Sequence, residues 1–391
     1  MKVMQVINQH RFRGGADVMA ERTAALLTRN GHEGVLLSRD SRVLGRGAVG
    51  KARAFVSGMY SRAGRRLMVS SLRADRPDLV HIHDVYPFFS PWVLRDCRRE
   101  GVPVVMTCHD FRLTCPAATH LCGSAVCELC LGGHELWCFL RNCRASRWES
   151  LGYALRSAVA RKWRLFLDNV TAYITPTEFV KRRLVAAGFP EQRITAVPNL
   201  IDVPESGVDP SVNQYVAYVG RITPEKGIST LLASAEMTGL RVRIAGDPSP
   251  MPELVKKAPA NVEFLGPLCR EDVETLYRSA RFLVLPSLWF ETFGLVAAEA
   301  MSHGVPVIAS NMGGLTEVVD DGATGFLFEP GNPEDLANKM RVLWGDPALC
   351  RRMGQTAREK VIREYSEDTH YRRLTAVYET AIRTAKELRA A

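Results

Sequence analysis

The segment that decides the fold is FLVLPSLWFETFGLVAAEAM, residues 282–301. Its first four residues, Phe282–Leu285, predict a buried strand, and the turn at Pro286 leads into an apolar helix that begins near Phe293. A strand-to-helix turn of an α/β sheet binds anions, because free backbone N–H groups and the positive end of the helix dipole meet there. The segment therefore predicts an anionic ligand at this turn.

Two carboxylates bracket the expected helix. Glu291 falls in the loop before it and Glu299 along it, eight residues later. At a rise of 1.5 Å per residue this separation is at most about 12 Å, roughly the reach of a nucleotide-diphosphate sugar. One carboxylate can hold sugar hydroxyls and the other ribose hydroxyls, with the diphosphate at the helix N-terminus. The paired carboxylates of a glycosidase lie closer together, so we assign both to binding and orientation.

Strand and helix patterns alternate along the chain, which is typical of parallel βαβ units. The expected strands are 3–7, 35–37, 79–83, 104–107, 172–175, 194–197, 215–219, 242–245, 262–264, 282–285, 305–309 and 326–328. Residues 204–211 read as a linker. We expect an α/β protein with two Rossmann-like, doubly wound domains, 1–203 and 212–391, facing each other across a cleft. The closing helix, 366–388, is expected to pack back toward the first domain.

Composition agrees with a globular chain of two domains. The 391 residues are 46% hydrophobic and 24% charged, which excludes a disordered protein. No run approaches 18 apolar residues, and the first residues read as a short strand and not as a signal peptide. We expect a cytoplasmic protein.

Two cations follow the expected strand that ends at Gly220. Arg221 can clamp phosphate oxygens with two hydrogen bonds, and Lys226 adds a point charge just before a helix. The sequence contains no Asp-x-Asp pair, which would hold Mg²⁺ on a diphosphate. We therefore expect no Mg²⁺ requirement, with these cations and the helix N-terminus neutralising the diphosphate.

Two features of the first domain are expected to line the same cleft. Gly14 and Gly15 separate the first strand from its helix and allow either a close approach to a phosphate or sugar, or only a tight turn. The spacing is not Gly-x-Gly-x-x-Gly, which disfavours a nicotinamide cofactor. His109 follows the strand 104–107, so its side chain is expected at the carboxyl edge of the sheet.

Cysteine is concentrated in one insert at about 108–143, which holds seven of the ten cysteines. Cytosolic thiols stay reduced, so this clustering favours a metal over disulfides. Cys127-x-x-Cys130 is a natural knuckle that Cys115 and Cys143 can complete as a structural zinc site. The alternative ligands are His120 and His134. An iron–sulfur cluster and incidental thiols are the other interpretations of the insert, which is expected to shape the acceptor side.

Net charge is +9, and the segment from Arg141 to Arg183 contains ten Lys and Arg residues but only three acidic residues. Apolar residues recur at helical spacing through this region. They are Trp148, Leu151, Leu155, Val159, Trp163 and Phe166. We favour the interpretation that this stripe is core and the arginines are its solvated side. The alternative is a basic amphipathic helix on an anionic bilayer; nucleic-acid binding is a third option, without a recognised motif.

The motifs together resemble glycosyltransferase family 4, over nearly the whole chain. The matching segments are Gly14–Ala16, 80–83, 107–110, Pro198-Asn199, 220–227, 286–301, 303–309 and 313–319. The resemblance implies a GT-B fold, retention of anomeric configuration and no Mg²⁺. It implies that Arg221 and Lys226 hold the diphosphate and Glu299 the ribose. It also places Glu291, with the backbone of Phe293, Gly294 and Leu295, at the donor sugar and phosphate, and His109 near the reacting carbon.

The cysteine-rich insert resembles a bacterial sub-branch linked to surface polysaccharide assembly. Gly246-Asp247-Pro248 departs from the family's frequent Gly-Asp-Gly, so the nucleotide stays open. We expect a retaining glycosyltransferase that takes a nucleotide-diphosphate sugar to a saccharide or lipid-linked acceptor, with possible peripheral membrane contact. The alternatives are a nucleotide-sugar epimerase or hydrolase of the same fold, and a zinc-dependent nucleic-acid-binding protein.

Overall fold

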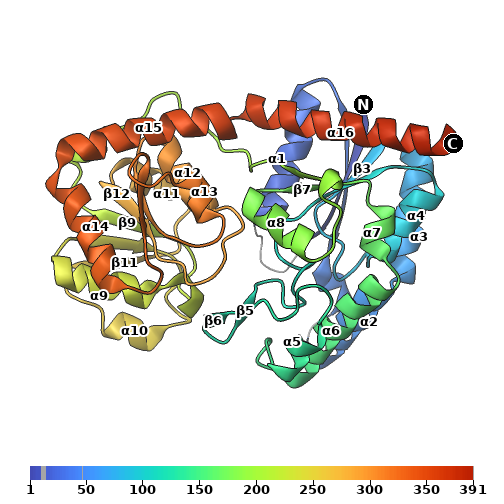
Figure 1. The fold of residues 1–391 in the computed structure, drawn as a ribbon, viewed down its shortest axis with the longest axis horizontal. Helices are drawn as coiled ribbons and strands as arrows, with labels where there is room; N and C mark the ends of the chain where they lie inside the picture. Colours follow the sequence, from blue (N-terminus) through green and yellow to red (C-terminus); the bar gives the residue numbers. More distant parts are fainter. Residues whose placement is uncertain (10–14, 46, 391) are drawn as a thin grey trace. The chain divides into compact units, whose positions relative to one another are not determined.

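The computed structural model describes residues 1–9, 15–45 and 47–390. They form two compact units (Figure 1). The first unit contains residues 1–123, 127–197 and 370–391, and the second contains 124–126 and 198–369. The boundary after Val197 lies just before the predicted linker, and residues 370–391 group with the first unit although the sequence placed them in the second domain.

The first unit is built on a six-stranded parallel sheet with the order β2-β1-β3-β4-β7-β8. Its strands are β1 (Lys2–Gln9), β2 (Glu33–Asp40), β3 (Leu79–Ile82), β4 (Val104–Thr107), β7 (Ala172–Thr175) and β8 (Ile194–Ala196). Its helices are α1 (Gly15–Arg29), α2 (Gly47–Met59), α3 (Arg62–Asp75), α4 (Trp92–Arg99), α5 (Leu136–Leu140), α6 (Arg147–Lys162), α7 (Leu165–Asn169) and α8 (Glu178–Ala186). The short strands β5 (Leu121–Cys122) and β6 (Ala125–Val126) lie in the cysteine-rich segment.

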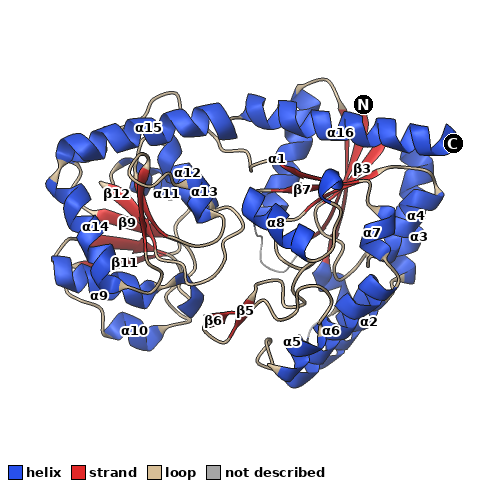
Figure 2. Ribbon diagram, in the orientation of Figure 1, coloured by secondary structure: helices blue, strands red, loops and turns tan. Residues whose placement is uncertain are grey.

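The second unit repeats this plan with a sheet of order β11-β10-β9-β12-β13-β14, also parallel. Its strands are β9 (Val216–Val219), β10 (Val242–Ala245), β11 (Val262–Gly266), β12 (Phe282–Leu285), β13 (Val307–Ser310) and β14 (Gly325–Phe328). Its helices are α9 (Ile228–Thr238), α10 (Pro252–Lys256), α11 (Arg270–Arg278), α12 (Leu295–Ser302), α13 (Leu315–Val318), α14 (Pro333–Gly345) and α15 (Pro347–Tyr365). Figure 2 shows helices around the strands of each unit.

Both faces of the second sheet are buried, which explains why its strands read as continuous apolar runs. Successive side chains point to opposite faces, so Phe282 and Val284 pack with Leu231 of α9 on one side. Leu283 packs with Ala298 of α12 on the other. The burial of both faces fixes the strand ends, and therefore the loops that leave their carboxyl ends.

The last helix, α16 (Glu367–Ala390), packs on the first unit, as predicted. Leu374 and Tyr378 are buried against Val3 and Leu79 of the first sheet. All twelve predicted strands are present, and every predicted bound lies within two residues of the observed one except the end of β2, which lies three residues further along the chain. Among the described residues, no helix combines the length and apolar character needed to cross a membrane.

Two glycines with nearly the same backbone conformation differ in their surroundings. Gly227 (φ +69°) and Gly239 (φ +67°) flank α9. A Cβ on Gly227 would lie 1.8 Å from the carbonyl oxygen of Pro286, whereas one on Gly239 would meet nothing within 4 Å. Gly227 is therefore needed for close contact between two loops, and Gly239 only for its left-handed conformation.

We predict that Gly227→Ala destabilises the protein by at least about 2 kcal/mol more than Gly239→Ala, because both replacements strain the backbone but only the first forces two loops apart. Urea unfolding of both variants measures the difference. Equal destabilisation would contradict the tight packing of the two loops.

Candidate functional site

Three loops meet at the carboxyl edge of the second sheet, after β9, β12 and β13. The backbone N–H of Leu288 donates to the carbonyl of Glu225 (2.8 Å), and that of Gly314 donates to the carbonyl of Glu291 (2.7 Å). A Cβ on Gly314 would lie 2.6 Å from the carbonyl oxygen of Thr292. Only glycine permits this approach, so the segments 220–227, 286–294 and 311–314 form one cluster.

An ion pair joins the first two loops. Lys226 Nζ lies 2.6 Å from Glu291 Oε1, and both side chains are less than one-fifth exposed. Ser287 Oγ (2.8 Å) and Trp289 Nε1 (2.9 Å) donate to the same oxygen. Burial raises the pKa of Glu291, but Lys226 and the two other donors outweigh it and the pKa is lowered overall. Glu291 is therefore a carboxylate at neutral pH.

Arg221 is the more accessible cation of the cluster. Its side chain is 64% exposed and lies 3.5 Å from Glu225. The Arg221 guanidinium and the Lys226 ammonium lie 5.8 and 5.1 Å from the centre of the Trp289 ring. The two predicted cations therefore converge on one aromatic side chain, Trp289, which the sequence analysis did not single out.

The helix α12 begins beside these cations. Gly294 adopts φ +100° and precedes Leu295, and as the N-cap residue it has no side chain that could cap the first N–H groups of the helix. Phe293 is buried and packs edge-on against Tyr365 at 5.2 Å, so only its backbone is offered to a ligand. Uncapped N–H groups at a helix N-terminus are an anion site when a ligand charge is present.

Glu299 lies in the second turn of α12. Tyr277 donates its hydroxyl to Glu299 Oε2 at 3.2 Å. Burial, and then the Glu299 charge, raise the pKa of Tyr277 well above its usual value, so the tyrosine remains a donor. The predicted donor residues Arg221, Lys226, Glu291 and Glu299 thus all belong to the second unit, on the helix or loops around it.

In the first unit, the partly buried His109 follows β4 and joins a chain of buried polar side chains. His109 Nε2 lies 2.8 Å from His83 Nδ1, with the rings stacked at 5.1 Å. His83 Nε2 lies 2.7 Å from Gln5 Oε1, and Gln5 Nε2 donates to Tyr378 Oη at 3.3 Å. The chain continues from Tyr378 Oη to His81 Nδ1 and from His81 Nε2 to Thr107 Oγ1, each at 2.7 Å.

The side-chain oxygen of Gln5 fixes the tautomers of His83 and His109. Gln5 Oε1 can only accept, so His83 carries its proton on Nε2 and its Nδ1 accepts from His109. His109 is therefore protonated on Nε2. Burial lowers the pKa of His109 to about 4, and it lowers those of His81 and His83 as well. All three rings are neutral at pH 7.

We predict that this cluster makes stability pH-dependent. Between pH 7 and 5.5 the unfolded chain protonates His81, His83 and His109, whose pKa values are lowered in the folded chain, so stability falls as pH falls. Each ring contributes about 1 kcal/mol of this loss. Urea unfolding at the two pH values measures it.

Between pH 7 and 5.5, the free energy of unfolding of His83→Gln should fall by about 1 kcal/mol less than that of wild type. His134→Gln, at an exposed histidine, should match wild type. An equal pH effect in the His83 variant would contradict the buried neutral state.

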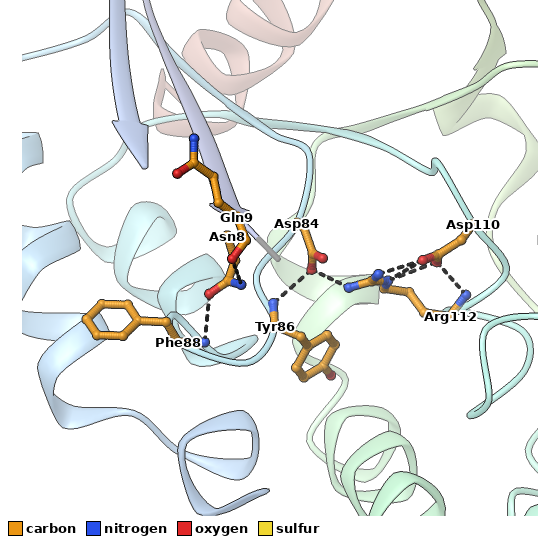
Figure 3. Close-up of polar contacts among 7 residues, drawn as sticks. All are labelled: Asn8, Gln9, Asp84, Tyr86, Phe88, Asp110 and Arg112. Atoms are coloured by element: carbon orange, nitrogen blue, oxygen red, sulfur yellow. Dashed lines mark hydrogen bonds and ion pairs between the residues drawn. The ribbon is translucent and has the colours of Figure 1, made fainter. Parts of the chain in front are cut away.

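A second polar group ties the neighbouring loops together (Figure 3). Arg112 forms ion pairs with both Asp84 and Asp110, the latter at 2.5 Å. Asp84 also accepts from the backbone of Tyr86 at 2.8 Å. At the end of β1, Asn8 accepts from the backbone N–H of Phe88 at 3.0 Å. The end of β1 and the loops after β3 and β4 are thus held together beside His109.

Sequence reasoning found His109 but missed the residues that support it. Gln5 and Tyr378 gave no local signal, since each is an ordinary polar residue within an apolar pattern. The pair His81-x-His83 was noticed only through the family resemblance. Gly15 is the first residue of α1, and Gly14 lies outside the described residues, so the proposed role of this glycine pair stays a prediction.

The cysteine-rich segment brings several thiols close enough to affect one another. Burial, followed by Cys115, Cys138 and Cys127, raises the pKa of Cys130 to about 12. Burial, then Cys138, raises that of Cys143. In the described part of the chain, however, no three His, Cys, Asp or Glu side chains are grouped as metal ligands. The zinc site of Cys115, Cys127, Cys130 and Cys143 stays a prediction.

We predict one zinc ion per purified chain, because zinc binds thiolates and overcomes their raised pKa. Cys127→Ser and Cys130→Ser should each lose the zinc ion. Metal analysis by mass spectrometry tests it. Cys269→Ser, at an exposed cysteine, is the control that should retain the metal. Metal-free wild-type protein would contradict the site.

Comparison with known proteins decides the family. Residues 13–205 match the family model Glycosyltransferase Family 4, and residues 204–360 match Glycosyl transferases group 1. The chain belongs to the family 4 glycosyltransferases. The membership predicted from the motifs is confirmed.

Two curated relatives of this glycosyltransferase carry the name D-inositol 3-phosphate glycosyltransferase. The one from Mycobacterium sp. (strain KMS) is 41% identical over 305 residues, which cover 70% of this chain and 61% of the relative. The one from Corynebacterium kroppenstedtii is 35% identical over 191 residues, covering 44% and 42%. The chain thus matches less than two thirds of the length of these relatives.

Solved structures share the fold of the glycosyltransferase. Sucrose-phosphate synthase from Thermosynechococcus elongatus has a TM-score of 0.71 and 20% identity, and all of both chains is covered. Anabaena HepE in complex with UDP and glucose has a TM-score of 0.66 and 17% identity, with 97% of this chain and 100% of HepE covered. The predicted GT-B fold, with two parallel-sheet α/β units, is confirmed.

Proposed function

We propose that the protein is a retaining glycosyltransferase that takes a nucleotide-diphosphate sugar and transfers the sugar to a saccharide or lipid-linked acceptor without a divalent metal. The observation that carries the donor proposal is the cluster of Arg221, Lys226 and the uncapped start of α12 in one unit. Together they supply two positive charges and free N–H groups, which suit a diphosphate.

The geometry of Glu291 supports its role at the donor sugar. All three of its hydrogen bonds within the described residues go to Oε1. Oε1 is therefore saturated, and Oε2 remains for a ligand hydroxyl. A carboxylate held by Lys226 keeps its charge, so it can accept hydrogen bonds from sugar hydroxyls and orient the ring.

Charge neutralisation argues for a metal-free reaction. A leaving diphosphate gains negative charge as the sugar departs, and preorganised cations and N–H dipoles stabilise that charge. Arg221 is free to move to the phosphates because its ion pair with Glu225 is long and exposed. In a retaining transfer on one sugar face, the leaving phosphate accepts the acceptor's proton as the new glycosidic bond forms.

The roles of Glu299 and of the first unit complete the proposal. Glu299 is fixed through Oε2 by Tyr277 and is offered to ribose hydroxyls. Neutral His109 would act through hydrogen bonds and not as a cation, since its pKa is about 4. The UDP bound to HepE favours a uridine nucleotide as the donor's nucleotide. We expect the transfer to take place in the cytoplasm, during synthesis of a surface polysaccharide or glycoconjugate.

We predict that Lys226→Ala and Glu291→Ala each reduce transfer by about 10²-fold or more, because each removes a charge from the donor site and leaves its partner unpaired. The measurement starts with a thermal-shift panel of UDP-, GDP- and ADP-sugars. Turnover with the selected donor is then followed with and without EDTA, and NMR of the product gives the anomeric configuration.

The matched control is Lys256→Ala, since Lys256 forms an exposed ion pair with Glu253 (2.8 Å) in the same unit. It should retain wild-type turnover. Wild-type activity in the Lys226 and Glu291 variants would overturn the assignment of the site. Sugar release or epimerisation without an acceptor, in place of transfer, would favour the hydrolase or epimerase alternative.

A further inference from the structure

One face of the first unit exposes apolar side chains that the sequence analysis expected to be core. Trp148 is 84% exposed, Trp163 56% and Leu155 44%. Of the predicted stripe, only Phe166 is fully buried. The core interpretation is therefore wrong for most of this stripe, because α6 uses other faces to pack on its neighbours.

The exposed residues of α6 share one side of the helix. Trp148, Leu155 and Lys162 follow one another at seven-residue spacing, which places them in line along the helix. Helix α6 packs on α2 beside this line, where a Cβ on Gly152 would lie 3.1 Å from the Phe55 ring and Glu149 pairs with Lys51 at 2.7 Å. Trp148 and Leu155 nevertheless stay exposed next to this contact.

Helix α5 extends this apolar face. Leu136, Trp137 and Leu140 are 60%, 42% and 57% exposed. They line a shallow groove of about 430 Å³ together with Leu151 and Leu155 of α6. Exposed apolar surface gathered in this way marks an interaction site more often than a random surface feature. We call the exposed residues of α5 and α6 the α5–α6 face.

The charge around the α5–α6 face indicates what covers it. Residues 134–164 contain seven Lys and Arg but only two acids. Both acids already have partners, since Glu135 pairs with Arg161 (2.7 Å) and Glu149 with Lys51. Within the described residues, the exposed cations Arg141, Arg147 and Lys162 have no acidic partner. An anionic surface would neutralise them.

We propose that the α5–α6 face docks on a bilayer that contains anionic phospholipid. Tryptophan and leucine enter the boundary between headgroups and acyl chains, and tryptophan prefers that boundary. The three unpaired cations meet lipid phosphates, and the attraction is strongest for an anionic leaflet. Docking needs neither sugar donor nor acceptor, so it stands apart from the proposed transfer reaction.

The test is flotation of the full chain with vesicles of neutral phosphatidylcholine, or of the same lipid with 30% phosphatidylglycerol (roughly the anionic fraction that gives a strong surface potential). Wild type should float with the anionic vesicles, and added salt should weaken this binding. Trp148→Ser with Leu155→Ser should weaken binding by about tenfold or more. Replacement by Gln of Arg141, Arg147 and Lys162 should weaken vesicle binding by roughly fivefold for each charge removed.

Matched controls come from exposed residues of the second unit. Val342→Ser with Ile362→Ser removes comparable exposed apolar groups, and Lys257, Arg278 and Arg352 replaced by Gln remove the same charge. Both controls should float as wild type does, and circular dichroism should show all variants folded.

The proposal would be overturned if wild-type protein floated with neither kind of vesicle, or if the α5–α6 variants floated as well as wild type. So would light scattering that shows a wild-type dimer and a monomeric Trp148 and Leu155 variant, because a second copy would then cover the face. Flotation of wild type with loss in both α5–α6 variants supports docking, whatever the outcome of the transfer assays.

Discussion

The cluster of loops after β9, β12 and β13, which we propose binds the donor, depends on the ion pair between Lys226 and Glu291. The two residues lie on loops from different strands, and 65 positions separate them along the chain. Because both side chains are largely buried, removal of either leaves a charge without a partner, which costs far more than loss of a surface pair. The pair therefore sets the position of the loop after β9 against the loop after β12, and with it the place of Arg221, Trp289 and the start of α12.

The polar cluster of the first unit is organised differently. It is built on hydrogen bonds between histidines and neutral polar side chains, and burial keeps its histidines neutral. The side-chain oxygen of Gln5 sets the direction of the hydrogen bonds from His109 to His83 and from His83 to Gln5. Gln5 in turn donates from Nε2 to the hydroxyl of Tyr378, on the last helix. The tautomer of His109 thus depends on the docking of the C-terminal helix, a requirement that no local motif contains.

The sequence predicted the parts of this structure that depend on short-range patterns. Apolar runs gave the strands, and strand ends followed by Gly220 or Pro286 gave the loops of the donor cluster. Glu291 and Lys226 were each assigned to the ligand, but their pairing was missed because it is a contact between distant loops. The stripe from Trp148 to Phe166 shows the same limit, since periodicity gives a helix face but not what that face contacts.

The exposed and partly buried cations of the two units differ in whether a carboxylate lies beside them, and this difference suits them to different ligands. Arg221 and Lys226 have carboxylate partners and lie at a helix N-terminus, where a compact anion meets several donors at fixed positions. Among the residues that the structure describes, Arg141, Arg147 and Lys162 have no carboxylate partner, and they border exposed tryptophan and leucine. Cations that lie beside a carboxylate at a helix N-terminus suit one discrete ligand, because its charge replaces or joins a defined carboxylate. Cations without carboxylate partners around an apolar face suit an anionic lipid surface, because its many phosphates can be contacted in many positions.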